Sequence, residues 1–207
     1  MSLLRRRAMY RDGEFPDMYQ KLAFLQSDGK QYLLIDDYIP QIGDSLSTNF
    51  VIMYDSYNNT GAIFSAGNDK FQLIALTGYY NGRPAIFMKY FTSGDASRKE
   101  NVVKREKPYN LRVFSDGKIL FDGVEIMSEV SKSKDSVNTK LYLFIRSNLY
   151  QRFPGKILGF QAYRSGKTIL NLVPALRSSD GKPGMLDTVS KKFYVNQGTG
   201  EFLYELA

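Results

Sequence analysis

The 207-residue chain contains no cysteine, no histidine and no tryptophan. Without cysteine there is no disulfide and no thiol nucleophile, and without histidine there is no Ser-His-Asp triad. The usual ligands of a zinc site are missing for the same reason. An enzyme with this composition would have to rely on carboxylates or other oxygen groups. The absence of cysteine is compatible with assembly in a reducing cytoplasm, although it constrains the compartment only weakly.

Long apolar runs are also missing. The longest, such as 71–76, are far shorter than the roughly 20 residues needed to span a bilayer, so we expect no membrane partner. The first ten residues carry charge with no apolar segment behind it, and we therefore expect no secretory signal. Apolar residues make up 43% of the chain and charged residues 24%, which predicts a single globular domain rather than a disordered chain.

Aromatic and β-branched residues occur in short stretches bounded by Gly, Asn, Asp and Ser, a pattern typical of β proteins. In 156–163, Leu158, Phe160 and Ala162 are expected to share one face of a strand. About a dozen strands without a helical spacer predict two packed antiparallel sheets. The predicted strands are 21–25, 31–35, 49–54, 61–66, 71–76, 84–90, 109–114, 119–121, 124–126, 141–145, 156–163 and 168–173.

Two phrases lie near the ends of the chain. The first is Leu22-Ala-Phe-Leu-Gln-Ser-Asp-Gly-Lys-Gln-Tyr32, and the second runs from 155 through Pro174-Ala175 to the turn-rich stretch 181–200. Together they resemble the concanavalin A-like, laminin-G-like jelly-roll domains of bacteriophage virion proteins and of surface proteins of gut bacteria. The resemblance covers roughly residues 20 to 204.

This resemblance implies that the first and last strands lie together in one sheet. It further implies that 185–186 and 193–195 form a hairpin against that sheet, followed by a last strand at 201–204. We therefore predict an all-β, two-sheet antiparallel jelly-roll sandwich over residues 21–207, preceded by a short basic N-terminal arm over residues 1–20.

The arm carries part of the net charge of +7. It could be disordered, contact nucleic acid, or anchor the domain on a larger assembly. The third interpretation is favoured because the arm combines apolar residues, which gain from burial, with arginines that can make bidentate contacts. The residues expected to anchor it are Leu4, Arg5, Arg6, Arg7 and Tyr10.

A second basic cluster, 98–107, is diluted by Glu100 and Glu106. We interpret it as a solvated loop, and we expect no nucleic-acid partner.

Nothing in the sequence predicts an enzyme. Glycoside hydrolases that resemble this fold carry a Glu-x-Asp-x-x-Glu triplet on one strand, since hydrolysis needs two carboxylates at the scissile bond. The chain has no such triplet, and its nearest pair, Glu125 and Glu129, lies across the end of a strand and a serine-rich loop.

Calcium prefers hard oxygen ligands, which Asp36, Asp37 and Asp55 with Asn58 and Asn59 could supply. Adjacent acids and asparagines are also ordinary turn residues, so we predict no metal and no cofactor.

Two segments have the composition of a binding edge, 54–59 and 77–83, in which Tyr, Asn, Asp and Arg cluster. Both are predicted as loops, and tyrosine rings there could stack on sugars. The candidate glycan-binding residues are Tyr54, Tyr57, Asn58, Tyr79, Tyr80 and Arg83.

The resemblance favours a non-enzymatic structural protein of a bacteriophage particle. The protein would sit on the capsid or tail through its arm, contact other virion proteins and have host surface polysaccharide as a candidate ligand. It would be assembled in the host cytoplasm, and a homo-oligomer is a candidate state. The alternative is a free or cell-surface carbohydrate-binding module, and a third hypothesis is a hydrolase with an unrecognised carboxylate pair.

Overall fold

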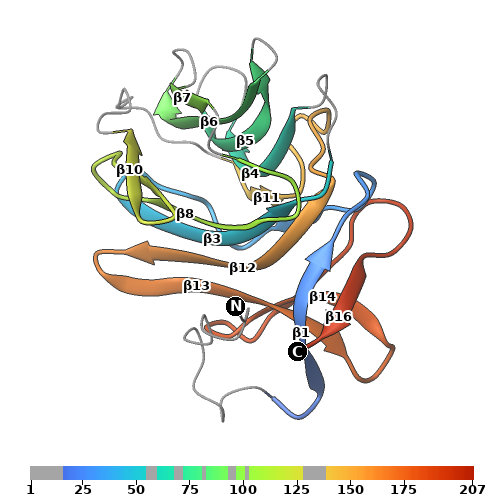
Figure 1. The fold of residues 1–207 in the computed structure, drawn as a ribbon. Coiled ribbons are helices and arrows are strands. Elements are labelled where there is room, and N and C mark those ends of the chain that lie inside the picture. The colour runs from blue at the N-terminus through green and yellow to red at the C-terminus, as the bar shows by residue number, and fades with distance from the viewer. Residues whose placement is uncertain are drawn as a thin grey trace.

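A computed structural model describes residues 16–54, 60–67, 72–80, 83–92, 97–100, 103–127 and 139–207. These residues form sixteen β-strands, which are arranged as two antiparallel sheets lying face to face (Figure 1). Within the described ranges, nothing forms a helix long and apolar enough to cross a membrane. The prediction of an all-β, two-sheet jelly-roll sandwich is confirmed.

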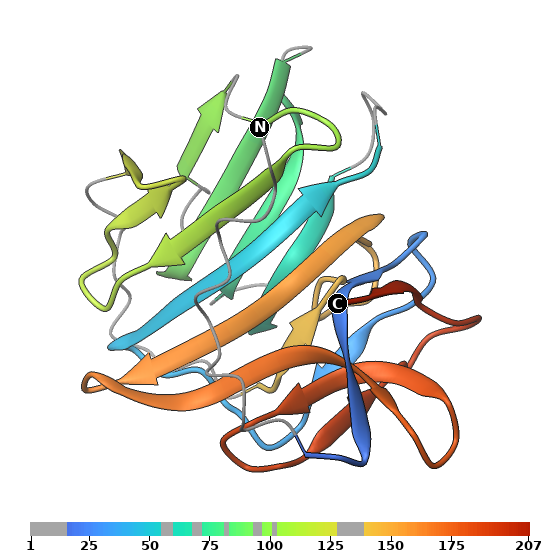
Figure 2. The same ribbon diagram turned by 60° about the horizontal axis from the view of Figure 1, so that its bottom comes forward.

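The larger sheet, sheet A, has ten strands, and its central strands β8, β3 and β12 lie side by side in Figure 2. Strand β12 pairs with β3 on one edge and with β13 and β1 on the other. In spatial order sheet A consists of β10 (Val124–Met127), β9 (Ile119–Phe121), β8 (Pro108–Val113), β3 (Asp44–Ile52), β12 (Gly155–Arg164), β1 (Tyr19–Gln26), β13 (Lys167–Arg177), β14 (Lys182–Asp187) and β15 (Phe193–Val195), and β16 (Leu203–Leu206) pairs with β1.

The smaller sheet, sheet B, covers one face of sheet A. In order it consists of β2 (Leu33–Ile35), β11 (Leu141–Leu143), β4 (Gly61–Gly67), β5 (Gln72–Tyr80), β6 (Arg83–Thr92) and β7 (Ser97–Glu100). Strand β4 is buried along its whole length, as expected for a strand at the middle of the sandwich.

The hydrophobic core fills the space between the sheets, because alternate residues of each strand point inward. Along β3, Leu46 and Phe50 face the core, and β8 contributes Leu111 in the same way. The rings of Phe64 in β4 and Phe160 in β12 meet edge to face, 5.4 Å apart between centroids, and so join the two sheets directly.

The predicted face of 156–163 is wrong at one position. Ile157 is fully buried with Phe160 and Ala162, whereas Leu158 is only half-buried. The reason is a β-bulge between Ile157 and Gly159 in the pairing with β3, which adds one residue and reverses the alternation.

The two end phrases meet, as the resemblance implied. Strand β16 pairs with β1, and β14 and β15 form the expected hairpin with Met185 opposite Tyr194. The loop after β1 binds the loop after β15: Gln31 Nε2 donates to the Thr199 carbonyl at 3.2 Å, and the Tyr32 amide donates to Asn196 Oδ1 at 3.1 Å. The turn-rich end of the chain thus closes the sandwich.

Several predicted boundaries differ from the structure; β3, for example, begins at Asp44 rather than at residue 49. Three other differences change an assignment. Strand β1 begins at Tyr19, inside the range assigned to the arm, because Tyr19 pairs with Arg177 of β13. Part of the basic cluster is not a loop, since 97–100 form β7 at the edge of sheet B. The segment 77–83 is not a loop either: β5 runs to Tyr80 and β6 starts at Arg83, its register partner.

Candidate functional site

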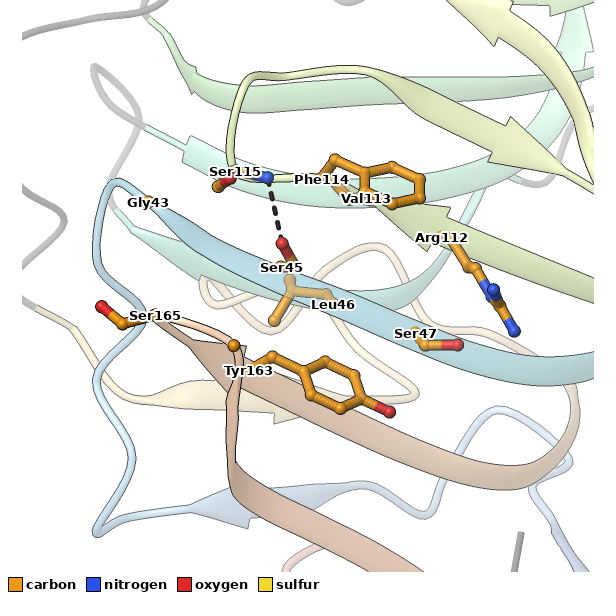
Figure 3. A pocket seen from close by; sticks show the side chains of 11 residues that line it. Gly43, Ser45, Leu46, Ser47, Arg112, Val113, Phe114, Ser115, Tyr163 and Ser165 are labelled. Carbon is orange, nitrogen blue, oxygen red and sulfur yellow. Dashed lines mark hydrogen bonds between the residues drawn. The ribbon is translucent and has the colours of Figure 1, made fainter.

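A groove with a volume of about 690 Å³ lies on the face of sheet A that points away from sheet B. It crosses the start of β3 and the ends of β8 and β12, and the turns after β8 and β12 form its rim. Its floor and walls include Ser45 and Ser47 of β3, Arg112 of β8 and Tyr163 of β12, which Figure 3 shows around one space.

The strand register brings these side chains to one face. Ser47 lies opposite Arg112 on one side and opposite Gln161 on the other, and Gln161 in turn lies opposite Asn171 of β13. The four residues form a polar row across four adjacent strands. Their neighbours along the chain, such as Leu46, face the core.

Hydrogen bonds hold one end of this polar row in place. The Tyr163 hydroxyl donates to Gln161 Oε1 at 2.6 Å, Gln161 Nε2 donates to Asn171 Oδ1 at 3.0 Å, and Asn171 Nδ2 donates to Thr188 Oγ1 at 2.7 Å. Burial raises the pKa of the Tyr163 hydroxyl, and this effect exceeds that of the positive charge of Arg112, which lowers the pKa. The hydroxyl therefore stays protonated at neutral pH and keeps its donor role.

At the other end of the polar row, the polar groups of Ser47 and Arg112 are not part of this hydrogen-bond chain. Ser47 is only 5% exposed, and its Oγ has no hydrogen-bond partner among the described residues. Arg112 is exposed, and no described residue forms a hydrogen bond or an ion pair with its guanidinium. Both residues line the groove, Arg112 with an exposed guanidinium and Ser47 with a buried hydroxyl.

Asp44 lies next to the groove, but its carboxylate is committed elsewhere. It is 1% exposed and accepts hydrogen bonds from Tyr38 at 2.8 Å, from the Gln41 amide at 2.9 Å and from both Nε and Nη2 of Arg164 at 2.7 and 2.9 Å. Burial, with Asp44 nearby, raises the pKa of the Tyr38 hydroxyl far above its usual range. This cluster fixes the start of β3 against the end of β12.

Some of the predicted glycan-binding residues are brought together. The Tyr54 hydroxyl bonds the carbonyl of Thr77 at 3.0 Å, so the two predicted segments meet there, but the Tyr54 ring packs edge to face on Phe153 and is half-buried. Arg83 is exposed and lies 3.7 Å from Glu100. Tyr57 and Asn58 lie outside the described residues, as do the side chains of Tyr79 and Tyr80. This site stays a prediction.

The arm residues Leu4, Arg5, Arg6, Arg7 and Tyr10 also lie outside the described residues.

Of the acidic residues considered as calcium ligands, those that the structure describes bind other side chains. Asp36 accepts a hydrogen bond from Lys192 at 2.5 Å, which lowers the pKa of the Asp36 carboxyl. Asp37 accepts a hydrogen bond from the Tyr194 hydroxyl, so this pair joins the end of β2 to β15. Asp55, Asn58 and Asn59 are outside the described residues, and across the described ranges no group of three acidic side chains could hold a metal ion.

Glu125 forms an ion pair with Lys118 at 2.8 Å, and Glu129 lies outside the described residues. In the basic cluster, Arg105 Nε forms an ion pair with Glu106 Oε1 at 3.0 Å.

Sequence reasoning missed the groove. Ser45, Ser47, Arg112 and Tyr163 were not among the candidates, although the alternation of Ser45-Leu46-Ser47 is the signal of a strand with one polar face.

Solved structures of other proteins share this fold. A native heptameric SAP-like pentraxin from Limulus polyphemus is 11% identical with a TM-score of 0.58, over 91% of this chain and 94% of that one. A candidate carbohydrate-binding protein from Bacteroides ovatus is 13% identical with a TM-score of 0.59, over 90% of this chain and 60% of that one.

A tailspike protein of bacteriophage CBA120 is matched over 69% of this chain and 25% of that one, at 13% identity and a TM-score of 0.47, which is too low to carry an argument. No model of a protein family matches the chain, and no curated protein matches its sequence. The chain thus has the jelly-roll fold of the pentraxin and the Bacteroides protein, and identities this low establish the fold alone.

Proposed function

We propose that this protein is a non-enzymatic, saccharide-binding jelly-roll domain of a bacteriophage particle. The observation that carries the proposal is the groove across β8, β3 and β12, which combines serine hydroxyls, the Tyr163 ring and the guanidinium of Arg112, for which the described residues provide no partner. A carbohydrate-binding role for the Bacteroides ovatus protein of the same fold is compatible with it.

The groove has the chemistry that sugar recognition needs. Sugars present hydroxyls in fixed directions, and the groove offers hydroxyl groups that both donate and accept. Tyr163 adds an aromatic surface next to a polar tip, which suits a sugar ring with one apolar and one polar edge. The volume of about 690 Å³ lies within the range of ordinary ligand sites.

The same groove supports binding rather than hydrolysis. Glycoside hydrolysis uses two carboxylates on either side of the scissile bond. None of the described residues that line the groove is an Asp or a Glu, and the adjacent Asp44 is buried and bound by Arg164. A hydrolase would need a carboxylate pair in another part of the molecule.

The particle role rests on the resemblance of the two end phrases and on the basic, partly apolar arm. In this proposal the arm docks on another virion protein, the domain is displayed on capsid or tail, and host surface polysaccharide is the ligand. Mass spectrometry of purified particles should find the protein at fixed stoichiometry. Its absence from particles, with glycan binding retained, would favour the alternative of a free or cell-surface carbohydrate-binding module.

Binding of host glycans by purified full-length protein tests the saccharide role. Tyr163→Ala should abolish binding, whereas Tyr163→Phe should weaken it less because the ring remains. The matched control is a triple alanine variant of Tyr79, Tyr80 and Arg83, in the other candidate site. Loss of binding in that variant with full binding by Tyr163→Ala would move the site to the hairpin of β5 and β6.

A further inference from the structure

The charge of the groove indicates which saccharides it takes. Of the described residues that line it, Arg112 alone is charged. Building on the proposed function, we infer that the groove recognises a saccharide that carries a carboxylate, such as a uronic acid. Arg112 binds the carboxylate, and Ser47 and Tyr163 contact the sugar that bears it.

The first support is the guanidinium of Arg112, which has no carboxylate partner in the described part of the chain. Other cations near this end of the sheet have carboxylate partners: Arg164 Nε donates to Asp44 at 2.7 Å, and Lys118 Nζ lies 2.8 Å from Glu125. Arg112 is exposed at the groove with no such partner among the described residues. A planar guanidinium matches a carboxylate through two parallel hydrogen bonds, and such charge-assisted bonds are stronger than neutral ones.

The buried hydroxyl of Ser47 is an independent support. Its Oγ has no partner within the described ranges, and Ser47 lies directly opposite Arg112 in the strand register. Figure 3 shows the Ser47 hydroxyl and the Arg112 guanidinium at the same part of the groove. A buried hydroxyl without a partner is unfavourable, so a ligand oxygen that enters between these two residues would satisfy a group that the described residues leave unsatisfied.

The single cation favours a carboxylate over a phosphate. A phosphate monoester carries close to two negative charges at neutral pH, whereas a carboxylate carries one. Arg112 supplies one positive charge, and no second cation lines the groove in the described part of the chain. A sulfate ester also carries one charge but lacks the planar pair of oxygens, and the experiment below distinguishes it.

The test is binding of the full-length protein to an array that holds uronic-acid glycans, their carboxyl-reduced counterparts, sulfated glycans and phosphorylated glycans. Uronic-acid glycans should bind, and reduction of the carboxyl should weaken binding about 10- to 100-fold, the effect of losing a charged hydrogen-bond partner. Arg112→Gln should cause a similar loss with an unchanged melting temperature. Arg105→Gln, at an exposed arginine that pairs with Glu106 outside the groove, is the matched control and should bind like the parent protein.

The outcomes separate the two proposals. Equal binding of uronic-acid and reduced glycans, preference for sulfated or phosphorylated glycans, or full binding by Arg112→Gln would overturn the carboxylate inference and leave the saccharide role standing. Binding to no glycan at all would refute the proposed function, and the inference with it.

Discussion

Gly198 lies where the two end phrases of the chain meet, and its replacement by alanine tests how the sandwich is closed. A Cβ atom at 198 would lie 1.9 Å from the Lys30 carbonyl oxygen and 2.9 Å from its carbonyl carbon. Both are backbone atoms, so no side-chain rotation can relieve the contact. Because atoms in contact normally lie about 3.5 Å apart, one of the loops must move by roughly 1.5 Å.

Such a movement would strain the hydrogen bonds between the two loops. The Thr199 amide donates to the Lys30 carbonyl at 3.3 Å, the Gln197 amide donates to the Tyr32 carbonyl at 2.9 Å, and the bonds of Gln31 and Asn196 described above lie beside them. A net hydrogen bond contributes about 0.5–1.5 kcal/mol. Loss of two of the four therefore costs about 1–3 kcal/mol, which agrees with typical costs of overpacking.

We expect Gly198→Ala to lower the free energy of unfolding by about 1–3 kcal/mol and the melting temperature by roughly 2–12 °C, given about 2–4 °C per kcal/mol for a domain of this size. Urea denaturation followed by circular dichroism measures it. Gly159→Ala is the control, because its nearest neighbour, the Leu172 carbonyl, lies 3.4 Å away and the same substitution should change stability by less than about 1 kcal/mol. Equal stabilities of the two variants would refute the steric argument.

Two further predictions concern charged pairs. Arg164→Gln leaves the buried Asp44 carboxylate without its counter-charge and should lower the free energy of unfolding, measured by urea denaturation, by about 3 kcal/mol. This value is at the low end for a buried pair because Arg164 is 38% exposed. A decrease of less than about 1 kcal/mol would contradict the prediction. Hydrogen bonding from Arg177 lowers the pKa of Asp180 to about 2, so this pair stabilises the fold above about pH 4 and the contribution is lost as the pH falls toward 2. A carboxyl NMR titration of Arg177→Gln should show the Asp180 pKa returning toward its ordinary value, and an unchanged pKa would exclude the pair as the cause.

The fold could be predicted because its signals are local. The strands β8 and β9 and the turn between them follow from alternating apolar residues and from Ser115-Asp116-Gly117, where Gly117 has a φ of 89°. The start of β3 was missed because Asp44 to Asn49 is a polar run with one aliphatic residue, Leu46, so the alternation of Ser45-Leu46-Ser47 is too short to distinguish a strand from a turn. Strand β7 was missed because its charged residues pair only with β6 at the sheet edge.

The groove could not be predicted in this way, because it depends on how distant strands align. Ile157 pairs with Phe50 and Gln161 with Ser47, so four steps along β12 correspond to three along β3. Without the extra residue of the bulge, Gln161 would lie opposite Leu46, and the apolar set of one strand would meet the polar set of the other. The bulge therefore aligns both faces at once, with Phe160 turned to the core and Gln161 in the polar row beside Ser47. No local feature of 157–161 shows this, because the inserted residue, Leu158, is apolar like its neighbours in the core. The partner strand is also distant in the sequence: the hydrogen bond between Thr48 and Gly159 joins residues that are 111 positions apart.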